Sequence, residues 1–137
     1  AFLGPDLSEK TLYHGHSYGG NALAAAVALK HLQLMESMNV LDNVRARSAQ
    51  LSEALRARLN LFERVKEIRV AGLMGAVELD TTDDPKLARR TCAAMVERGV
   101  LSRSMGPVIT IVPPLTITAA EIDHIVATLA AALEETI

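Results

Sequence analysis

The spacing of apolar residues predicts two helices in the first half of the chain. Residues 22–37 are apolar on all sides in their first half, so we expect this helix to be buried on every side, with Asn21 as its N-cap. Residues 40–60 carry their apolar side chains along one stripe, which predicts a helix with a single buried face. The stripe consists of Val44, Leu51, Leu55 and Leu59.

Start and stop residues predict two further helices in the second half. Asp84 followed by Pro85 is typical of a helix start, and Gly99 is of the type found just past a helix end. The stretch from Thr118 to Glu121 has the pattern of a capping box, which predicts the start of the last helix. The inward-facing residues of that helix are expected to be Ile122, Ile125, Val126, Leu129 and Leu133.

Between the helices the apolar residues alternate with polar ones, as they do in β-strands. Ile68 and Val70 alternate with charged residues, and two short strands are predicted to meet near Gly72. Residues 100–103 and 108–112 form a second predicted pair of strands, separated by the sequence SMGP. This order of elements predicts an α+β fold, in which helices cover a small sheet of antiparallel type.

Composition and charge narrow the function classes. The chain of 137 residues is 50% hydrophobic with only 3% aromatic residues, so we expect one modest domain with an aliphatic core. A net charge of −2 argues against a nucleic-acid partner. The most apolar stretch, residues 22–29, is too short to cross a membrane. The single cysteine, Cys92, cannot form an internal disulfide, which fits a cytoplasmic location.

The sequence HSYGGN at residues 16–21 is the first candidate site. A serine hydroxyl and glycines that let backbone N–H groups approach closely are suited to an anion, and the following helix presents its positive end. The stretch lacks the lysine of a Walker loop and the G-x-G-x-x-G spacing, so it is not a nucleotide fingerprint. From these residues alone, an ordinary turn is the simpler explanation.

Arg103 is the second candidate. It is predicted to end a strand, followed by the flexible SMG sequence, and a guanidinium there could hold a carboxylate through two parallel hydrogen bonds. A solvent-facing arginine at a strand end is the alternative, and spacing alone favours it.

The other polar residues give weaker signals. His14 and His16 could share one face of a strand and hold a metal, but no third ligand lies near them in the sequence. Ordinary loop hydrogen bonds explain the two histidines more simply, and we expect no metal. Cys92 is expected to pack inside its helix. No nucleophile and base pair is visible, so no catalytic residue is predicted within this chain.

Three motifs follow one another along the chain: YHGHSYGGNALAAAVAL, IRVAGLMGAVEL and RGVLSRSMGPVITIVPPLTITAAEID. Together they resemble those of the class III, fold-type I pyridoxal-phosphate aminotransferases. The stretch YHGHSYGGNALAAAVAL resembles the class pattern H-G-x-T-[YF]-x-G-N-P-L-A-C-A-A-A. IRVAGLMGAVEL resembles R-x-x-G-L-M-x-A-x-E-L, and RGVLSRSMGPVITIVPPLTITAAEID resembles G-V-x-x-R-x-x-G-x-x-I-x-x-x-P-P-L-x-I-T-x-x-E-I-D. The motifs keep the class order over nearly the whole chain. Within the class, the wording YHGHSY is most similar to the aminotransferases of biotin synthesis.

The resemblance implies a role for each candidate residue. Ser17 matches the position whose hydroxyl bonds the phosphate of the cofactor, pyridoxal 5'-phosphate, and His16 matches a backbone position that contacts the same phosphate. Gly15 matches a position whose backbone touches the substrate. Arg103 matches the arginine that pairs with the substrate carboxylate.

The resemblance also implies how the chain is organised. Residues 1–37 correspond to the end of the large cofactor-binding domain and a long linking helix, and residues 38–137 to the C-terminal small domain of a pyridoxal-phosphate-dependent transferase fold. The lysine that binds the cofactor in this class lies upstream of the matched region, so the chain alone is expected to be inactive. The class implies a homodimer whose cofactor sites are shared across the interface.

The reaction implied is transfer of an amino group to 8-amino-7-oxononanoate, giving 7,8-diaminononanoate, with S-adenosylmethionine or lysine as donor. An ω-amino-acid:pyruvate aminotransferase of the same class is the alternative enzyme, because it too has an arginine at the position of Arg103. A non-catalytic α+β interaction module is the alternative of another class.

Overall fold

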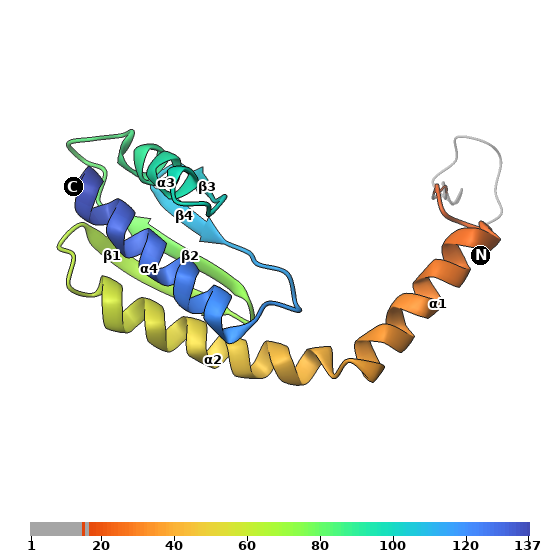
Figure 1. The fold of residues 1–137 in the computed structure, drawn as a ribbon. Coiled ribbons are helices and arrows are strands. Elements are labelled where there is room, and N and C mark those ends of the chain that lie inside the picture. Colours follow the sequence, from red (N-terminus) through yellow and green to blue (C-terminus); the bar gives the residue numbers. More distant parts are fainter. Residues whose placement is uncertain (1–14, 16) are drawn as a thin grey trace, which may run out of the picture. The chain divides into compact units, whose positions relative to one another are not determined.

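The computed structural model describes residue 15 and residues 17–137, and the chain divides into two units between Ser37 and Met38. The described part of the first unit is a turn at residues 17–20 followed by helix α1 (Ala22–Ser37), drawn in orange in Figure 1. The bounds of α1 are those that the sequence predicted.

The expected burial of α1 is wrong for this unit. No residue of the helix is buried, and Leu23 and Val27 are 76% and 62% exposed. An alanine-rich helix forms readily from local propensity, whereas its burial requires a second surface. The described residues of the first unit supply no such surface.

The second unit combines three helices with one sheet. Its elements, in chain order, are α2 (Val40–Leu59), β1 (Val65–Ala71), β2 (Met74–Leu79), α3 (Leu87–Glu97), β3 (Arg103–Met105), β4 (Val108–Ile111) and α4 (Ala119–Thr136). The strands form a four-stranded antiparallel sheet in the order β1-β2-β4-β3. The predicted α+β fold, with helices over a small antiparallel sheet, is confirmed.

All three helices cover the same face of this sheet. Along β2 the buried residues are Gly75, Val77 and Leu79, which alternate with more exposed ones, as expected when only one face is packed. Figure 1 shows α4 lying between α2 and α3 over the strands. At Gly75 a Cβ atom would stand 3.4 Å from Ile111 Cβ and 3.7 Å from Leu51 Cδ2, so the Leu51 side chain of α2 packs directly on β2 there.

The core includes the residues of α2 and α4 that the apolar periodicity selected, together with residues of α3 and the strands. Leu51, Leu55 and Leu59 of α2 are fully buried, and Val44 packs against them while partly exposed. In α4 the residues Ile122, Val126, Leu129 and Leu133 are fully buried, and Ile125 is partly buried. The core is aliphatic, because Phe62 is the aromatic residue beside it and is itself only partly buried.

The capping box at the start of α4 is confirmed. The Glu121 backbone N–H donates to the Thr118 hydroxyl over 3.3 Å, and the Thr118 backbone N–H donates to Glu121 Oε2 over 2.8 Å. These hydrogen bonds lower the pKa of the Glu121 carboxyl below its usual range. Asn43 of α2 fixes the loop before α4, since its Nδ2 donates to the carbonyl oxygens of Leu115 and Ile117.

Two predicted boundaries are wrong by a few residues. The strand expected at residues 100–103 lies instead at Arg103–Met105, because Gly106 (φ 58°) and Pro107 alone form the turn before β4. Arg103 therefore begins a strand and does not end one. Helix α3 begins at Leu87 and not at Pro85, because Asp84 caps the turn in front of the helix. Gly99 has φ 82° and follows the helix end, as predicted.

No helix among residues 22–137 is both long enough and apolar enough to cross a membrane.

The one-sided core predicts a large difference between two leucines of the second unit. Leu129→Ala removes a fully buried side chain beneath α4 and should lower the free energy of unfolding of the 137-residue chain by about 2–5 kcal/mol. Leu101 is 90% exposed, and Leu101→Ala should change it by less than about 0.5 kcal/mol. Urea unfolding followed by circular dichroism measures both values. Equal effects of the two substitutions would contradict the packing described.

Candidate functional site

The turn in front of α1 contains the first predicted site residues. Gly15 and Ser17 are exposed, whereas His16 lies outside the described residues. Residues 17–20 form the turn, in which Gly20 has φ 72°, a left-handed conformation that favours glycine. The Asn21 backbone N–H donates to the Tyr18 carbonyl over 3.1 Å and closes the turn. The hydroxyl of Ser17 is thus held at the surface, just before the helix.

The start of α1 has one capping hydrogen bond and no acidic residue in its first turn. Asn21 caps the helix as predicted, because its Oδ1 accepts a hydrogen bond of 3.0 Å from the Ala24 backbone N–H. The first turn contains no acidic residue, so no side-chain charge there neutralises the positive end of the helix dipole. The cap occupies one backbone N–H of the helix. Further hydrogen-bond donors to an anion would come from the turn in front of α1.

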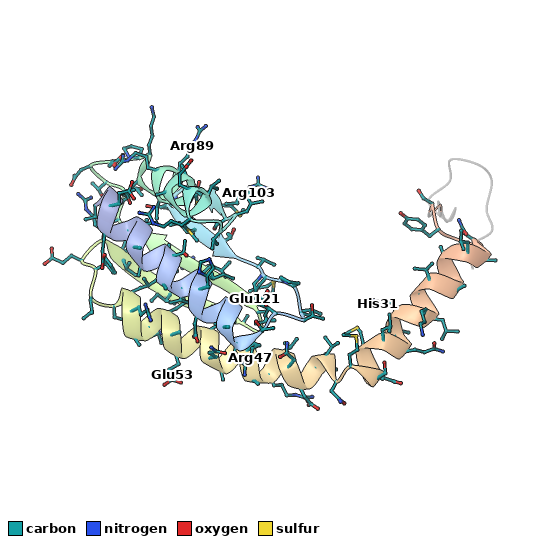
Figure 2. The ribbon with its side chains drawn as sticks, viewed as in Figure 1. His31, Arg47, Glu53, Arg89, Arg103 and Glu121 are labelled. Carbon is teal, nitrogen blue, oxygen red and sulfur yellow. The ribbon has the colours of Figure 1, made fainter. Side chains whose placement is uncertain are left out.

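A shallow apolar hollow runs along the first turns of α1. It begins at Tyr18 and Asn21, follows the helix past Leu23 and Val27, and ends at His31, which Figure 2 shows on the side of the helix. Tyr18 is 79% exposed. A polar turn at one end of an apolar surface is suited to a ligand or protein surface that is charged at one point and apolar elsewhere.

Arg103 lies on the face of the sheet that no helix of the second unit covers. In the register of the sheet, Arg69 stands opposite Ala76, Ala76 opposite Thr110, and Thr110 opposite Arg103. Residues directly opposite one another in antiparallel strands point to the same face. The four residues therefore form one row across the helix-free face, with an arginine at each edge (Arg103 is labelled in Figure 2).

The two arginines of this row differ in their partners. Arg69 donates to Glu78 Oε2 over 2.8 Å and also pairs with Glu67, and these hydrogen bonds raise the pKa of its guanidinium. Within the described part of the chain, the guanidinium of Arg103 has neither an ion pair nor a hydrogen bond. Arg103 is exposed, and its neighbours on this face include the apolar Met105 and Val108. Its charge is therefore available to an anion from outside the unit.

Sequence reasoning missed two hydroxyl groups that hold the backbone at Arg103. Thr110 Oγ1 donates to the Arg103 carbonyl over 2.9 Å, and Ser102 Oγ donates to the Thr110 carbonyl over 2.8 Å. The sequence could have placed Thr110 on the more exposed face of its strand, since it alternates with Ile109 and Ile111. Its partner became visible only with the correct position of the hairpin turn.

Two further polar residues, Cys92 and Asp80, have structural roles. Burial raises the pKa of the Cys92 thiol, which donates to Ser102 Oγ over 4.0 Å, so the thiol is a packed side chain. Hydrogen bonds from the Thr82 hydroxyl and backbone lower the pKa of Asp80 to about 2, as is typical of a turn residue. Among the residues that the structure describes, no three His, Cys, Asp or Glu side chains are grouped to hold a metal. His14 and His16 lie outside those residues.

A family comparison covers nearly the whole chain. The family model for "Aminotransferase class-III" matches residues 5–133. The match includes the turn before α1, which belongs to the first unit, and Arg103, which belongs to the second.

Individual relatives point to the same family. The chain is 40% identical to the adenosylmethionine-8-amino-7-oxononanoate aminotransferase of Geobacter sulfurreducens, over 92% of this chain and 29% of the relative. The crystal structure of the enzyme with the same name from Methanocaldococcus jannaschii matches with a TM-score of 0.81 and 36% identity, over 98% of this chain and 32% of that one. An ornithine aminotransferase structure from Toxoplasma gondii, described as having partial occupancy of pyridoxal phosphate, matches with a TM-score of 0.80 and 31% identity, over 90% of this chain and 29% of that one.

The chain therefore spans about a third of the length of the relatives that it matches.

Proposed function

Because this chain belongs to the class-III aminotransferases, we propose that it forms the C-terminal part of an aminotransferase that transfers an amino group to 8-amino-7-oxononanoate. The observation that carries the proposal is the guanidinium of Arg103 on the helix-free face of the sheet, which has apolar neighbours and no partner among the described residues. The acceptor has a carboxylate at one end of an apolar chain and a ketone near the other, so a cation flanked by apolar surface suits it.

The proposed organisation assigns a part of the enzyme to each unit. Residues 1–37 would be the end of the large cofactor-binding domain and a linking helix, and residues 38–137 the small domain. The division of the chain between Ser37 and Met38 supports these bounds. The chain spans about a third of its relatives, so we infer that the lysine holding the cofactor belongs to the remaining two thirds and that the isolated chain is inactive.

The cofactor of the class is pyridoxal 5'-phosphate, which supplies an electron sink for the carbon that gains or loses the amino group. The turn before α1 has donors suited to its phosphate: an exposed Ser17 hydroxyl, and a helix start without acidic residues. In our proposal the Ser17 hydroxyl and the His16 backbone bind this phosphate. Gly15, with no side chain, lets the backbone approach the substrate.

Arg103 would act by orientation. A guanidinium that donates two parallel hydrogen bonds fixes both the position and the plane of a carboxylate. With the far end of the acceptor held, its ketone is presented to the cofactor in a restricted geometry, which lowers the entropic part of the barrier. Arg69 is unsuited to this role, because Glu67 and Glu78 already occupy its guanidinium.

We propose that the enzyme is a cytoplasmic homodimer in which the turn before α1 closes the cofactor site of the other subunit. The support is the helix itself: α1 has an apolar surface but no buried residue within its own unit. Such a surface requires a covering partner in a stable protein. The amino donor is proposed to be S-adenosylmethionine, because the name of the Geobacter relative includes adenosylmethionine, and lysine is the alternative.

A comparison of acceptors tests the function. We expect the full-length enzyme that carries this chain to transfer amino groups to 8-amino-7-oxononanoate with a far higher kcat/KM than to pyruvate. A preference for pyruvate would replace the proposal with the ω-amino-acid:pyruvate reaction. Absence of both activities, together with absence of bound pyridoxal phosphate, would favour a non-catalytic module.

Replacing Arg103 tests the carboxylate role. Arg103→Ala should weaken acceptor binding by about 2–4 kcal/mol, seen as a rise in the acceptor KM, because the carboxylate loses its ion pair. Arg69→Ala is the matched control, since Arg69 lies in the same row of the same face but is paired with two glutamates. Steady-state kinetics should show an unchanged acceptor KM for this control. An acceptor KM of Arg103→Ala that is similar to that of the wild type would count against this role of Arg103.

Replacing Ser17 tests the phosphate role. Ser17→Ala removes a hydroxyl hydrogen bond to a charged group and should weaken cofactor binding by about 1.5–3 kcal/mol. Loss of pyridoxal phosphate absorbance during dialysis of the full-length enzyme measures the effect. Ser37→Ala, at the other end of α1, is the control and should retain the cofactor as the wild type does. Unaltered retention by Ser17→Ala would remove Ser17 from the cofactor site.

A further inference from the structure

Arg103 occupies a weak position in the sheet. It is the first residue of β3, which has only three residues and lies at the edge of the sheet, paired with β4 alone. The first residue of such a short edge strand frays easily, because few ladder hydrogen bonds hold it. A side chain that must bind a carboxylate in one orientation needs a fixed backbone beneath it.

Two hydroxyl groups supply hydrogen bonds at this point. Thr110 of β4, directly opposite Arg103, donates from Oγ1 to the Arg103 carbonyl over 2.9 Å. Ser102, the residue before the strand, donates from Oγ to the Thr110 carbonyl over 2.8 Å. One bond runs from β4 to β3 and the other returns from the chain before β3 to β4. The carbonyl of Arg103 and the side chain of the preceding residue are therefore both hydrogen-bonded to Thr110 of β4.

The pair of hydroxyls is also linked to the buried core. Ser102 is only partly exposed, and the Cys92 thiol of α3 stands 4.0 Å from its hydroxyl. Thr110 lies between Ile109 and Ile111, both of which are buried under the helices. Arg103 is thereby attached to residues that the core holds in place, although its own side chain is exposed.

We propose that Thr110, with Ser102, is a positioning residue for the substrate carboxylate: its hydroxyl fixes the Arg103 backbone so that the guanidinium is already oriented when the acceptor arrives. The inference rests on the proposed function, in which Arg103 binds that carboxylate. Thr110 does not contact the substrate. Its removal alters the geometry of Arg103 while leaving the positive charge in place.

The test uses the full-length enzyme carrying this chain. Thr110→Val keeps the shape of the side chain and removes its hydroxyl, and it should raise the acceptor KM about 3- to 10-fold, with kcat and the donor KM nearly unchanged. Thr110→Ser keeps the hydroxyl and should restore the wild-type KM. Thr82→Val, which removes an exposed hydroxyl bond to Asp80 in a distant turn, is the control and should leave every kinetic constant unchanged.

A double variant separates this inference from the proposed function. In an Arg103→Ala background, Thr110→Val should have no further effect on the acceptor KM, because the hydroxyl acts through Arg103. If Arg103→Ala raises the KM but Thr110→Val does not, the positioning role is wrong and the function stands. If Arg103→Ala itself leaves the KM unchanged, both are wrong. If Thr110→Val lowers kcat and raises the KM values for acceptor and donor to a similar extent, the defect is a general structural one and the inference is overturned.

Hydrogen exchange provides a readout that is independent of turnover. In the 137-residue chain, Thr110→Val should speed amide exchange in β3 while exchange in α4 stays as in the wild type. Ser102→Ala removes the second bond and should act in the same direction, which keeps the test open if Thr110→Val folds poorly. Unchanged exchange in β3 for both variants would contradict the proposed anchoring.

Discussion

The second unit depends on burial of one face of its sheet. The side chains that alternate toward the helices, such as Val77 and Ile109, are fully buried beneath leucines of α2 and α4. That apolar contact is the main favourable contribution to folding, and it fixes the register, because a shift of one residue would turn every buried side chain outward. Everything on the opposite face, Arg103 included, takes its position from this register.

The helix-free face shows how the same residue type can serve two purposes. Arg69 and Arg103 occupy equivalent places at the two edges of one row. Arg69 is paired with two carboxylates of its own sheet, whereas the described residues leave the charge of Arg103 unpaired. The two carboxylates, Glu67 on β1 and Glu78 on β2, lie in the half of the sheet that contains Arg69 and not in the half that contains Arg103. The net charge and the composition of the chain do not reveal this difference between the two arginines.

The sequence was sufficient for the elements and the core, because apolar periodicity and capping residues act locally. Leu51, Leu129 and the capping box at Thr118 were all readable in this way. The position of β3 could not be predicted in this way, since Gly106 and Ser104 are both acceptable turn residues and only the pairing with β4 decides between them. The hydrogen bond donated by the Thr110 hydroxyl depends on that pairing, so it could not be predicted either. The exposed state of α1 was missed because the pattern of a helix reports what it would bury and not whether a partner surface is present.

These outcomes indicate where function can be sought in a chain of this kind. The apolar side chains on the buried face of the sheet are covered by the helices of the second unit, so this face requires no further partner. By contrast, α1 exposes Leu23 and Val27, and the helix-free face exposes Met74 and Met105, so both surfaces offer contacts that the described residues of their units do not make. Folding of the second unit can therefore be explained from its own residues. In the function proposed above, Arg103 would bind a carboxylate, and both that ligand and a covering surface would come from outside the second unit.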